Sequence, residues 1–189
     1  MANQIKVEAG GQHIFRDSTD YAPAAANNWE QTGIAATFVQ IDCTSLADAA
    51  GRQSTVADLG ATWAGAYSVD AAIEFAATPT AGDVVEVYWS GTPDSAGSPS
   101  PGNTSGSDSA YTGDGGGTLA ESVKLMQFIG NFVCTDAATA TVQNAHVGVF
   151  SPPHRYGNLV IKNESGAAFH SDMVETSFVF NPILDEVQD

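Results

Sequence analysis

Alternation of apolar and polar residues between positions 67 and 90 constrains the fold of this chain more than any other feature. In the first run, 67–76, apolar side chains recur at Tyr67, Val69, Ala71, Ile73 and Phe75. The second run, 84–90, places Val85, Val87 and Trp89 on one face. Because side chains alternate faces along a strand, both runs predict strands with one buried face. Segment 78–83, rich in turn residues, separates them, so we expect an antiparallel hairpin.

Further strands are expected along the whole chain. Strand-like segments lie at 4–8, 13–17, 35–43, 55–59, 123–134, 139–150, 156–162, 167–170 and 173–180. Residues 45–50 predict a helical turn, and Gly130 predicts a bulge or bend within its strand. Short strands separated by turn residues are typical of sandwiches and barrels. We therefore expect a single all-β domain over residues 1–189, an antiparallel β-sandwich with jelly-roll or Greek-key connections.

Three segments are expected to lie outside the core of the sandwich. Residues 91–117 consist almost entirely of Gly, Ser, Pro, Thr, Asp and Asn. Such a segment buries too little apolar surface to fold by itself, so we expect an extended surface loop that orders against a neighbouring molecule. We interpret residues 1–30 as an N-terminal arm and residues 181–189 as an acidic C-terminal tail.

The charge balance is strongly acidic, with six Lys and Arg residues against 22 Asp and Glu residues and a net charge of −16. The basic residues form no cluster, and nucleic acids and anionic membranes bind clustered cations, so we expect neither partner. No apolar run approaches membrane-spanning length, and residues 1–11 contain no apolar signal segment. We expect a soluble chain made in a cytoplasm. The acidity is explained by solubility before assembly or by attraction to a basic partner.

The cysteines do not indicate a metal or redox site. Cys43 and Cys134 lie in strand-like segments, where a free cysteine behaves as a small buried apolar residue. The sequence does not establish whether Cys43 and Cys134 form a disulfide, because that depends on their separation in the fold. The sequence contains no zinc-site spacing and no phosphate-binding loop, so we expect no metal and no cofactor.

The histidines do not predict catalysis. His13, His146, His154 and His170 have no partners at the spacing of a catalytic or metal site, so structural or surface roles are expected. His170, Ser171 and Asp172 have the residue types of a hydrolytic triad. Neighbours along a strand point to opposite faces, however, and cannot form that triad. We therefore expect no catalytic residue and no enzymatic activity.

Several carboxylates have a functional and a simpler interpretation. Asp108 and Asp114 lie in Gly-rich sequence, where a solvated loop is favoured over an oxygen-ligand cation site. Glu74 and Glu86 lie on polar strand faces, where a solvated surface is favoured over a glycosidase pair. The glycosylation-like sequence at 163–165 is interpreted as a turn.

Aromatic residues leave a carbohydrate-binding module open as an alternative function. They are Trp29, Trp63, Trp89, Tyr88, Tyr111 and Tyr156. Aromatic side chains also dominate sandwich cores, and Trp89 continues the face of Val85 and Val87, so we expect Trp89 in the core.

Two segments and the long loop resemble small structural proteins of tailed-bacteriophage virions. The segments are AGDVVEVYWSG at 81–91 and RYGNLVIKNESG at 155–166, with DEVQ at 185–188. The resemblance extends over residues 67–189 and does not include residues 1–66. Within this class the chain is most similar to head decoration, or cement, proteins. That likeness implies a β-rich homo-oligomer, with a trimer favoured, bound to the major capsid protein on the capsid surface.

Other functions remain as alternatives. A tail, neck or baseplate component of the virion would share the same sequence character. A hydrolase would require a pocket with two converging carboxylates or a histidine-centred cluster, which the sequence does not indicate.

Overall fold

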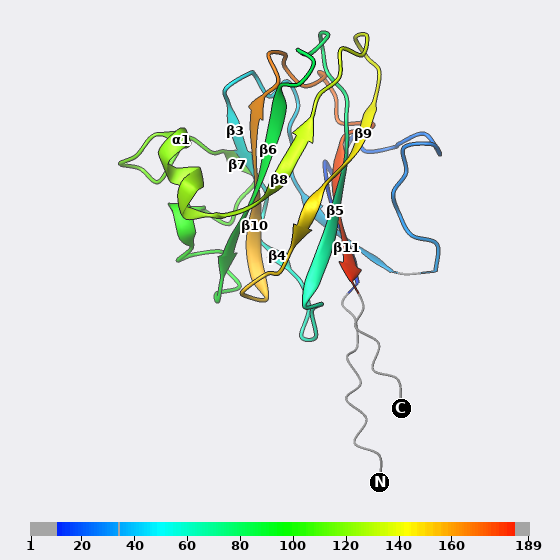
Figure 1. Cartoon of the computed structure of the whole chain (residues 1–189). Helices are drawn as coiled ribbons and strands as arrows, with labels where there is room; N and C mark the ends of the chain where they lie inside the picture. Colours follow the sequence, from blue (N-terminus) through cyan, green and yellow to red (C-terminus); the bar gives the residue numbers. More distant parts are fainter. Residues whose placement is uncertain (1–10, 34, 184–189) are drawn as a thin grey trace.

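The computed structural model describes residues 11–33 and 35–183, which form a sandwich of two β-sheets (Figure 1). Sheet A has the strand order β2-β1-β11-β5-β9, and sheet B has the order β7-β3-β10-β6-β8, with β4 also paired to β10. Sheet A comprises β1 (Gln12–Arg16), β2 (Ala36–Gln40), β5 (Ala66–Ile73), β9 (Gln143–Phe150) and β11 (Ser177–Ile183). Sheet B comprises β3 (Gly51–Gln53), β4 (Ala57–Asp58), β6 (Val84–Thr92), β7 (Ser109–Ala110), β8 (Gln127–Val133) and β10 (Tyr156–Glu164).

Paired strands run antiparallel, except that β1 and β2 are parallel. The expected all-β antiparallel sandwich is confirmed. The finer expectation of jelly-roll or Greek-key connections stays a prediction.

The inner faces of the two sheets bury one continuous apolar core, to which β5 and β6 both contribute. Trp89 is fully buried there, as expected. Its ring centroid lies 5.6 Å from that of Phe180 and 5.7 Å from that of Phe150. These separations are typical of stabilising aromatic pairs, so residues from three strands fix the spacing between the sheets.

The predicted hairpin between 67–76 and 84–90 is wrong, although both of its strands exist. β5 pairs with β11 and β9 in sheet A, whereas β6 pairs with β10 and β8 in sheet B. The connection 74–83 therefore crosses from one sheet to the other. Alternation shows that a strand buries one face, but it does not identify the neighbouring strand. Stacking the apolar faces of β5 and β6 across the core buries both.

Several predicted elements differ locally. Residues 163–164, interpreted as part of a turn, continue β10, and of the strand predicted at 167–170 only Phe169 pairs, in an isolated bridge with Phe75. Residues 45–50 form turns instead of a helical turn, with Ser45 and Ala49 at positive φ angles of 52° and 59°. The strand expected from 123 begins only at Gln127, because the chain before it forms α1 (Leu119–Ser122) and a 3₁₀ turn, Val123–Leu125. A capping box between Thr118 and Glu121 stabilises the start of α1.

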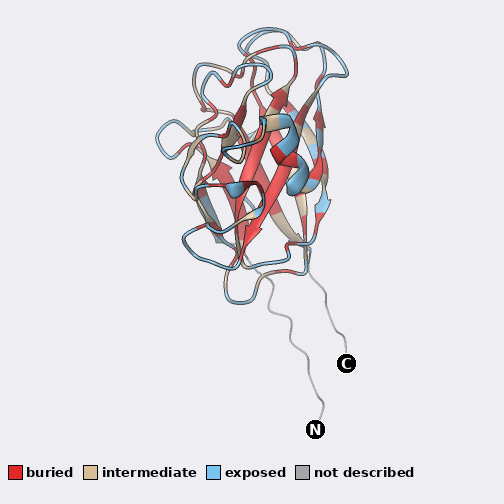
Figure 2. Cartoon of the chain, turned by 90° about the vertical axis from the view of Figure 1, so that its left-hand side faces the viewer, coloured by how far each residue is buried: buried red, intermediate tan, exposed pale blue. Residues whose placement is uncertain are grey.

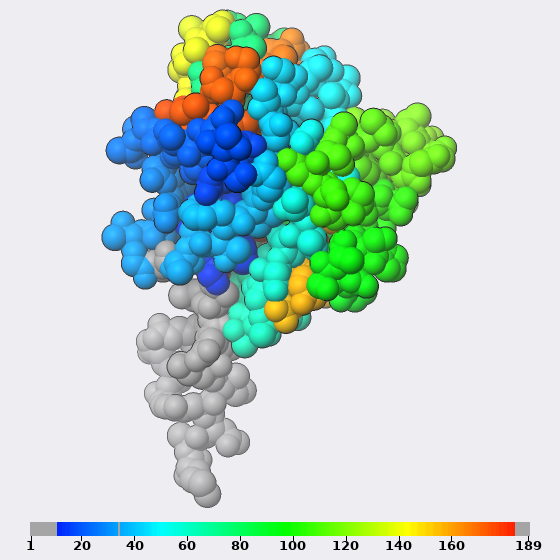
Figure 3. Space-filling model, turned by 180° about the vertical axis from the view of Figure 1, so that it is seen from behind, coloured from blue at the N-terminus to red at the C-terminus, as the bar shows by residue number. Residues whose placement is uncertain are grey.

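The ends of the described chain belong to the sandwich. Residues 12–16 of the expected N-terminal arm form β1, which is paired on both sides, to β2 and β11. Residues 181–183 of the expected tail complete β11, with Pro182 opposite Tyr67. The strand predicted at 4–8 and the rest of the tail lie outside the described residues. The blue segment after residue 11 packs closely against the body of the molecule (Figure 3).

Two glycines allow the edge strands β8 and β9 to approach each other and close one side of the sandwich. The register of β8 against β6 shifts beside Gly130, which confirms the predicted bulge. A Cβ atom on Gly130 would collide with the backbone oxygen of Val147. A Cβ atom on Gly148 would lie 2.5 Å from the backbone oxygen of Ile129. The two backbones can therefore lie this close only where side chains are absent.

Candidate functional site

The outer face of sheet B is partly covered by residues 93–126, which we call the excursion (Figures 1 and 2). It contains β7, α1 and a 3₁₀ turn at Pro101–Asn103. Its apolar side chains pack on the sheet in a second cluster, which consists of Tyr88, Val160, Tyr111, Val123 and Met126. The loop expected to order against a neighbouring molecule thus packs on its own sheet. The first two residues of the predicted loop, 91–92, belong to β6.

Asp108 anchors the excursion to the strands beneath it. Its carboxylate accepts hydrogen bonds from Arg52 Nε at 2.6 Å and from Gln40 Nε2 at 3.1 Å. The backbone N–H of Asp42 donates to the same carboxylate at 3.1 Å. Asp114 instead accepts from the backbone N–H groups of the turn at 116–117, and these bonds lower its pKa. Both carboxylates therefore stabilise loop structure, at separate places.

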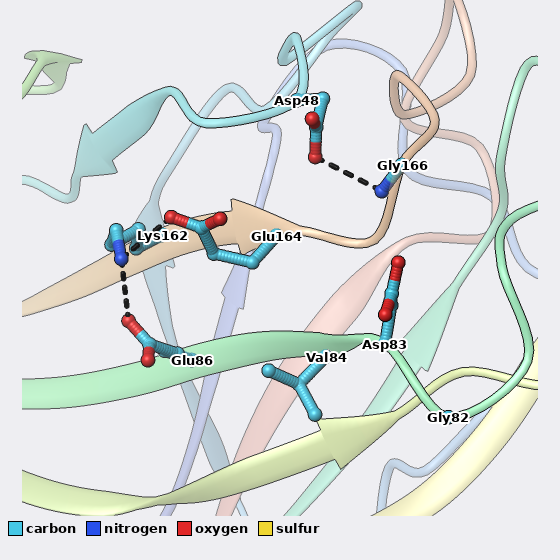
Figure 4. Close-up of a pocket in the computed structure, with 8 residues that line it drawn as sticks. All are labelled: Asp48, Gly82, Asp83, Val84, Glu86, Lys162, Glu164 and Gly166. Carbon is cyan, nitrogen blue, oxygen red and sulfur yellow. Dashed lines mark hydrogen bonds and ion pairs between the residues drawn. The ribbon is translucent and has the colours of Figure 1, made fainter.

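The uncovered part of this face contains a hollow of about 530 Å³, which we call the acidic recess (Figure 4). Its lining consists of Asp48, Gly82, Asp83, Val84, Glu86, Lys162, Glu164 and Gly166. Glu86 and Lys162 are direct partners in the pairing of β6 with β10. Glu164 lies two positions after Lys162 and therefore projects from the same face. Strand pairing thus brings these three charges together.

Among the described residues, Lys162 is the only cation that lines the acidic recess. Its Nζ atom lies 2.6 Å from Glu164 Oε1 and 3.1 Å from Glu86 Oε2, and its side chain is 13% exposed. Burial opposes the ammonium charge, but hydrogen bonds to Glu164 and Glu86 outweigh it and raise the pKa of Lys162. Four carboxylates against one ammonium group leave the recess negative, which suits a positively charged side chain of a partner.

Beside the acidic recess, the edge strand β8 and the turn before it expose large apolar side chains, which we call the β8 rim. They are Leu125, Phe128 and Val133, at 59%, 51% and 55% exposure. Val133 is the direct partner of Val84 in the recess lining. Apolar side chains grouped on a sheet edge are typical of a surface that contacts another molecule.

Sequence reasoning missed the acidic recess. The strand predicted at 156–162 ends before Glu164, whereas β10 continues through it. The opposite charges of Lys162 and Glu164, two positions apart, are a signal that is visible in the sequence. Glu86 lies 76 positions before Lys162, however. Only the pairing of β6 with β10 shows that they meet.

Glu74 and Glu86 do not form a facing pair. Glu86 lines the recess on sheet B, whereas Glu74 directly follows β5 of sheet A. Glu74 is also only 8% exposed, so the expectation of a solvated side chain is wrong for this residue. The two carboxylates therefore do not supply the pair that a glycosidase requires.

The four histidines lie in different elements. His13 of β1 is buried, and neither ring nitrogen has a hydrogen-bond partner among the described residues. Burial lowers the pKa of His13 to about 4, although Asp58 opposes this effect. His146 of β9 lies 3.1 Å from Asp70, and His154 is exposed in the turn before β10.

His170 does meet a carboxylate. Its Nδ1 atom lies 3.2 Å from Asp172 Oδ2, and Glu74 completes a cluster of three potential ligands. The strand argument does not apply here, because residues 170–176 are not in a strand. Ser171 is exposed, and no hydrogen bond joins it to His170 in the described chain, so the triad is not formed. This histidine-centred cluster was not anticipated from the sequence.

The aromatic residues weighed for carbohydrate binding are largely occupied in packing. Trp89, Tyr88 and Tyr111 are buried in the two apolar clusters. Trp29, Trp63 and Tyr156 are half-buried on separate segments.

Both cysteines are free and buried in the core. Burial raises the pKa of both thiols, that of Cys134 to about 11. Neither thiol is therefore poised for nucleophilic chemistry.

No protein-family model, curated protein or solved structure matches this chain. In the described ranges, no helix is long and apolar enough to cross a membrane.

Proposed function

We propose that this chain is a structural protein of a tailed-bacteriophage virion, a head decoration protein that binds and stabilises the capsid lattice. The observation that carries the proposal is the exposed β8 rim beside the acidic recess. The contact surface comprises the rim and the recess together, and its occupant is the major capsid protein.

The rim supplies the apolar part of this contact. Leu125, Phe128 and Val133 are each more than half exposed, so covering them removes apolar surface from water. Exposed apolar side chains of this size also favour aggregation when they are left uncovered. Stable binding to the capsid would cover these side chains and so prevent the aggregation.

The acidic recess supplies the specific part of this contact. Lys162 neutralises part of the charge of Glu86 and Glu164, and the remaining carboxylates are available to a basic side chain. Complementary charges mainly raise the association rate and fix the orientation of a complex. We therefore propose that the rim provides most of the affinity for the capsid protein, and that the recess fixes the orientation of the bound chain.

The resemblance of residues 67–189 to small virion proteins supports the same function. A rigid sandwich with an excursion packed on its own sheet also suits repeated binding to identical lattice sites. The proposal includes a homo-oligomer of three copies, as the resemblance implies. Light scattering of the purified chain tests this part, and a monomer would contradict it.

Binding to empty capsid shells that lack this chain tests the contact surface. Val133→Asp places a charge on the rim, and we expect its affinity for shells, measured by co-sedimentation, to fall at least ten-fold. Val149→Asp is the matched control, since Val149 is also 55% exposed but lies on β9 of sheet A. We expect the control to bind normally.

Two results would contradict the proposal. One is a native chain that does not bind shells, and the other is an equal loss of affinity in both variants. Binding to isolated tails or baseplates instead would favour the alternative virion location.

A further inference from the structure

Glu74, His170 and Asp172 meet at one end of the sandwich. Glu74 directly follows β5, whereas the other two lie in residues 165–176, which connect β10 of sheet B to β11 of sheet A. The backbone N–H of His170 donates to the Glu74 carbonyl at 2.9 Å, and Phe75 pairs with Phe169 in an isolated bridge. The backbone therefore fixes which side chains lie side by side.

The three side chains present ligand atoms at short range. One carboxylate oxygen from each acidic residue and one ring nitrogen of His170 all lie within 4.8 Å of one another. Around a four-coordinate zinc ion with ligand distances of about 2 Å, the ligand atoms lie about 3.3 Å apart. His170 Nδ1 and Asp172 Oδ2 already lie 3.2 Å apart, so binding requires this pair and Glu74 to move closer together.

The environment of Glu74 supports a metal site independently of the distances among the three ligand atoms. Only 8% of the residue is exposed, and no described residue forms a hydrogen bond or ion pair with its carboxylate. Burial raises its pKa, which His170 opposes and which nearby Asp172 and Glu175 reinforce. Partial desolvation of a carboxylate that lacks a protein partner disfavours its charge, and a bound cation offsets this effect.

His170 also offers a free nitrogen. Its Nδ1 atom is buried and lacks a hydrogen-bond partner in the described chain, because its 3.2 Å contact with Asp172 does not have hydrogen-bond geometry. Glu175 adds negative charge nearby, but its own carboxylate is held by the Ala24 N–H and by Asn27 Nδ2. It therefore strengthens the local field without acting as a ligand.

We propose that Glu74, His170 and Asp172 bind one divalent transition-metal ion, of which Zn²⁺ is the best match. One imidazole and two carboxylates suit Zn²⁺, and water completes its four-coordinate shell. Ca²⁺ takes six to eight oxygen ligands, which this set does not supply. The bound ion links residues 165–176 to the end of β5 and so clamps the crossover between the two sheets.

The clamp has a structural role in this position. Phe169 and Met173 of the same crossover are buried in the main core. An ion that fixes residues 170 and 172 therefore also holds these core side chains in place. The inference does not depend on where in a virion the chain resides.

Titration of the purified full chain with Zn²⁺ after treatment with a chelator tests the site. We expect one ion per chain by calorimetry and a rise in the thermal midpoint, with little response to Mg²⁺ or Ca²⁺. Glu74→Gln and His170→Asn are each expected to weaken Zn²⁺ affinity at least ten-fold. Visible absorption of bound Co²⁺ is expected to change in His170→Asn, since a nitrogen ligand is lost.

His146→Asn is the matched control. The His146 and Asp70 pair has the same two ligand types 3.1 Å apart, but Glu74 has no counterpart there. We expect this variant to bind Zn²⁺ like the native chain. If circular dichroism shows that Glu74→Gln does not fold, Asp172→Asn replaces it with the same expectation.

Three results would overturn the inference. The first is a native chain that binds no stoichiometric Zn²⁺. The second is native affinity in His170→Asn together with the Glu74 or Asp172 variant. The third is equal loss in His146→Asn, which would indicate binding by surface histidines in general.

Discussion

The ion pairs of this protein differ in how far they are shielded from solvent. Lys162 is 13% exposed between two carboxylates, whereas the pair of Arg155 with Asp58 is 36% and 47% exposed. Removing one member of a shielded pair leaves a costly unpaired charge, while a solvated pair contributes little. The same chemical contact therefore has different consequences at the two places.

Lys162→Met is expected to lower the free energy of unfolding by about 2 kcal/mol, because Glu86 and Glu164 lose their shared counter-charge. Arg155→Met is the control, with an expected loss below about 1 kcal/mol. Urea unfolding measures both. Equal losses would show that Lys162 is solvated like Arg155.

His13 is expected to make stability depend on pH. Its pKa is about 4 in the folded chain and 6.5 in the unfolded chain, so the unfolded state binds more protons between these values. The stabilisation is fully present above pH 6.5 and is lost as pH falls towards 4. The loss amounts to about 3 kcal/mol, from 1.36 kcal/mol per pKa unit.

His13→Phe removes this titration and keeps an aromatic ring beside Tyr67. Urea unfolding between pH 4 and 7 is therefore expected to show a shallower pH dependence in the variant. An unchanged slope would assign the pH dependence to other groups.

Among the elements, strand locations were more predictable from sequence than strand partners. Alternation located the strands at 67–76 and 84–90, because the inner face of a strand must be apolar whichever strand lies beside it. It did not show that β5 and β6 lie in different sheets, since long-range pairing leaves no local pattern. The cluster of Glu74 with His170 was unpredictable for the same reason. The prediction that the excursion orders against a neighbouring molecule was wrong. A few apolar side chains, among them Tyr111 and Met126, are enough to pack this polar segment on sheet B.

The contact between β8 and β9 is expected to tolerate no side chain at Gly130. Gly130→Ala places a Cβ atom against the backbone oxygen of Val147, and the strands must separate to accept it. We expect a loss of about 3 kcal/mol in unfolding free energy. Gly116→Ala is the control, because no atom lies within 4 Å of its added Cβ, and it is expected to be nearly neutral. A tolerated Gly130→Ala would mean that β8 and β9 are further apart in solution.

At the scale of the whole molecule, the strong excess of negative charge affects which surfaces the protein can bind. Most basic side chains of the described residues are already engaged: Arg52 with Asp108, Arg155 with Asp58, Lys162 in the recess, and Arg16 over the Phe38 ring at 4.0 Å. The net charge of −16 per chain opposes non-specific association between the proposed oligomers in solution. A basic capsid surface would overcome that repulsion, whereas a second acidic surface would not. Under the proposed function, the charge balance therefore favours binding to the lattice over non-specific self-association.

Electron microscopy of the virion that contains this chain tests the central proposal most directly. We predict density for the sandwich on the outer surface of the head, with the β8 rim and the acidic recess against the major capsid protein. A chain located in the tail, neck or baseplate, or absent from the particle, would contradict the proposal. So would a head-bound chain whose rim and recess face solvent.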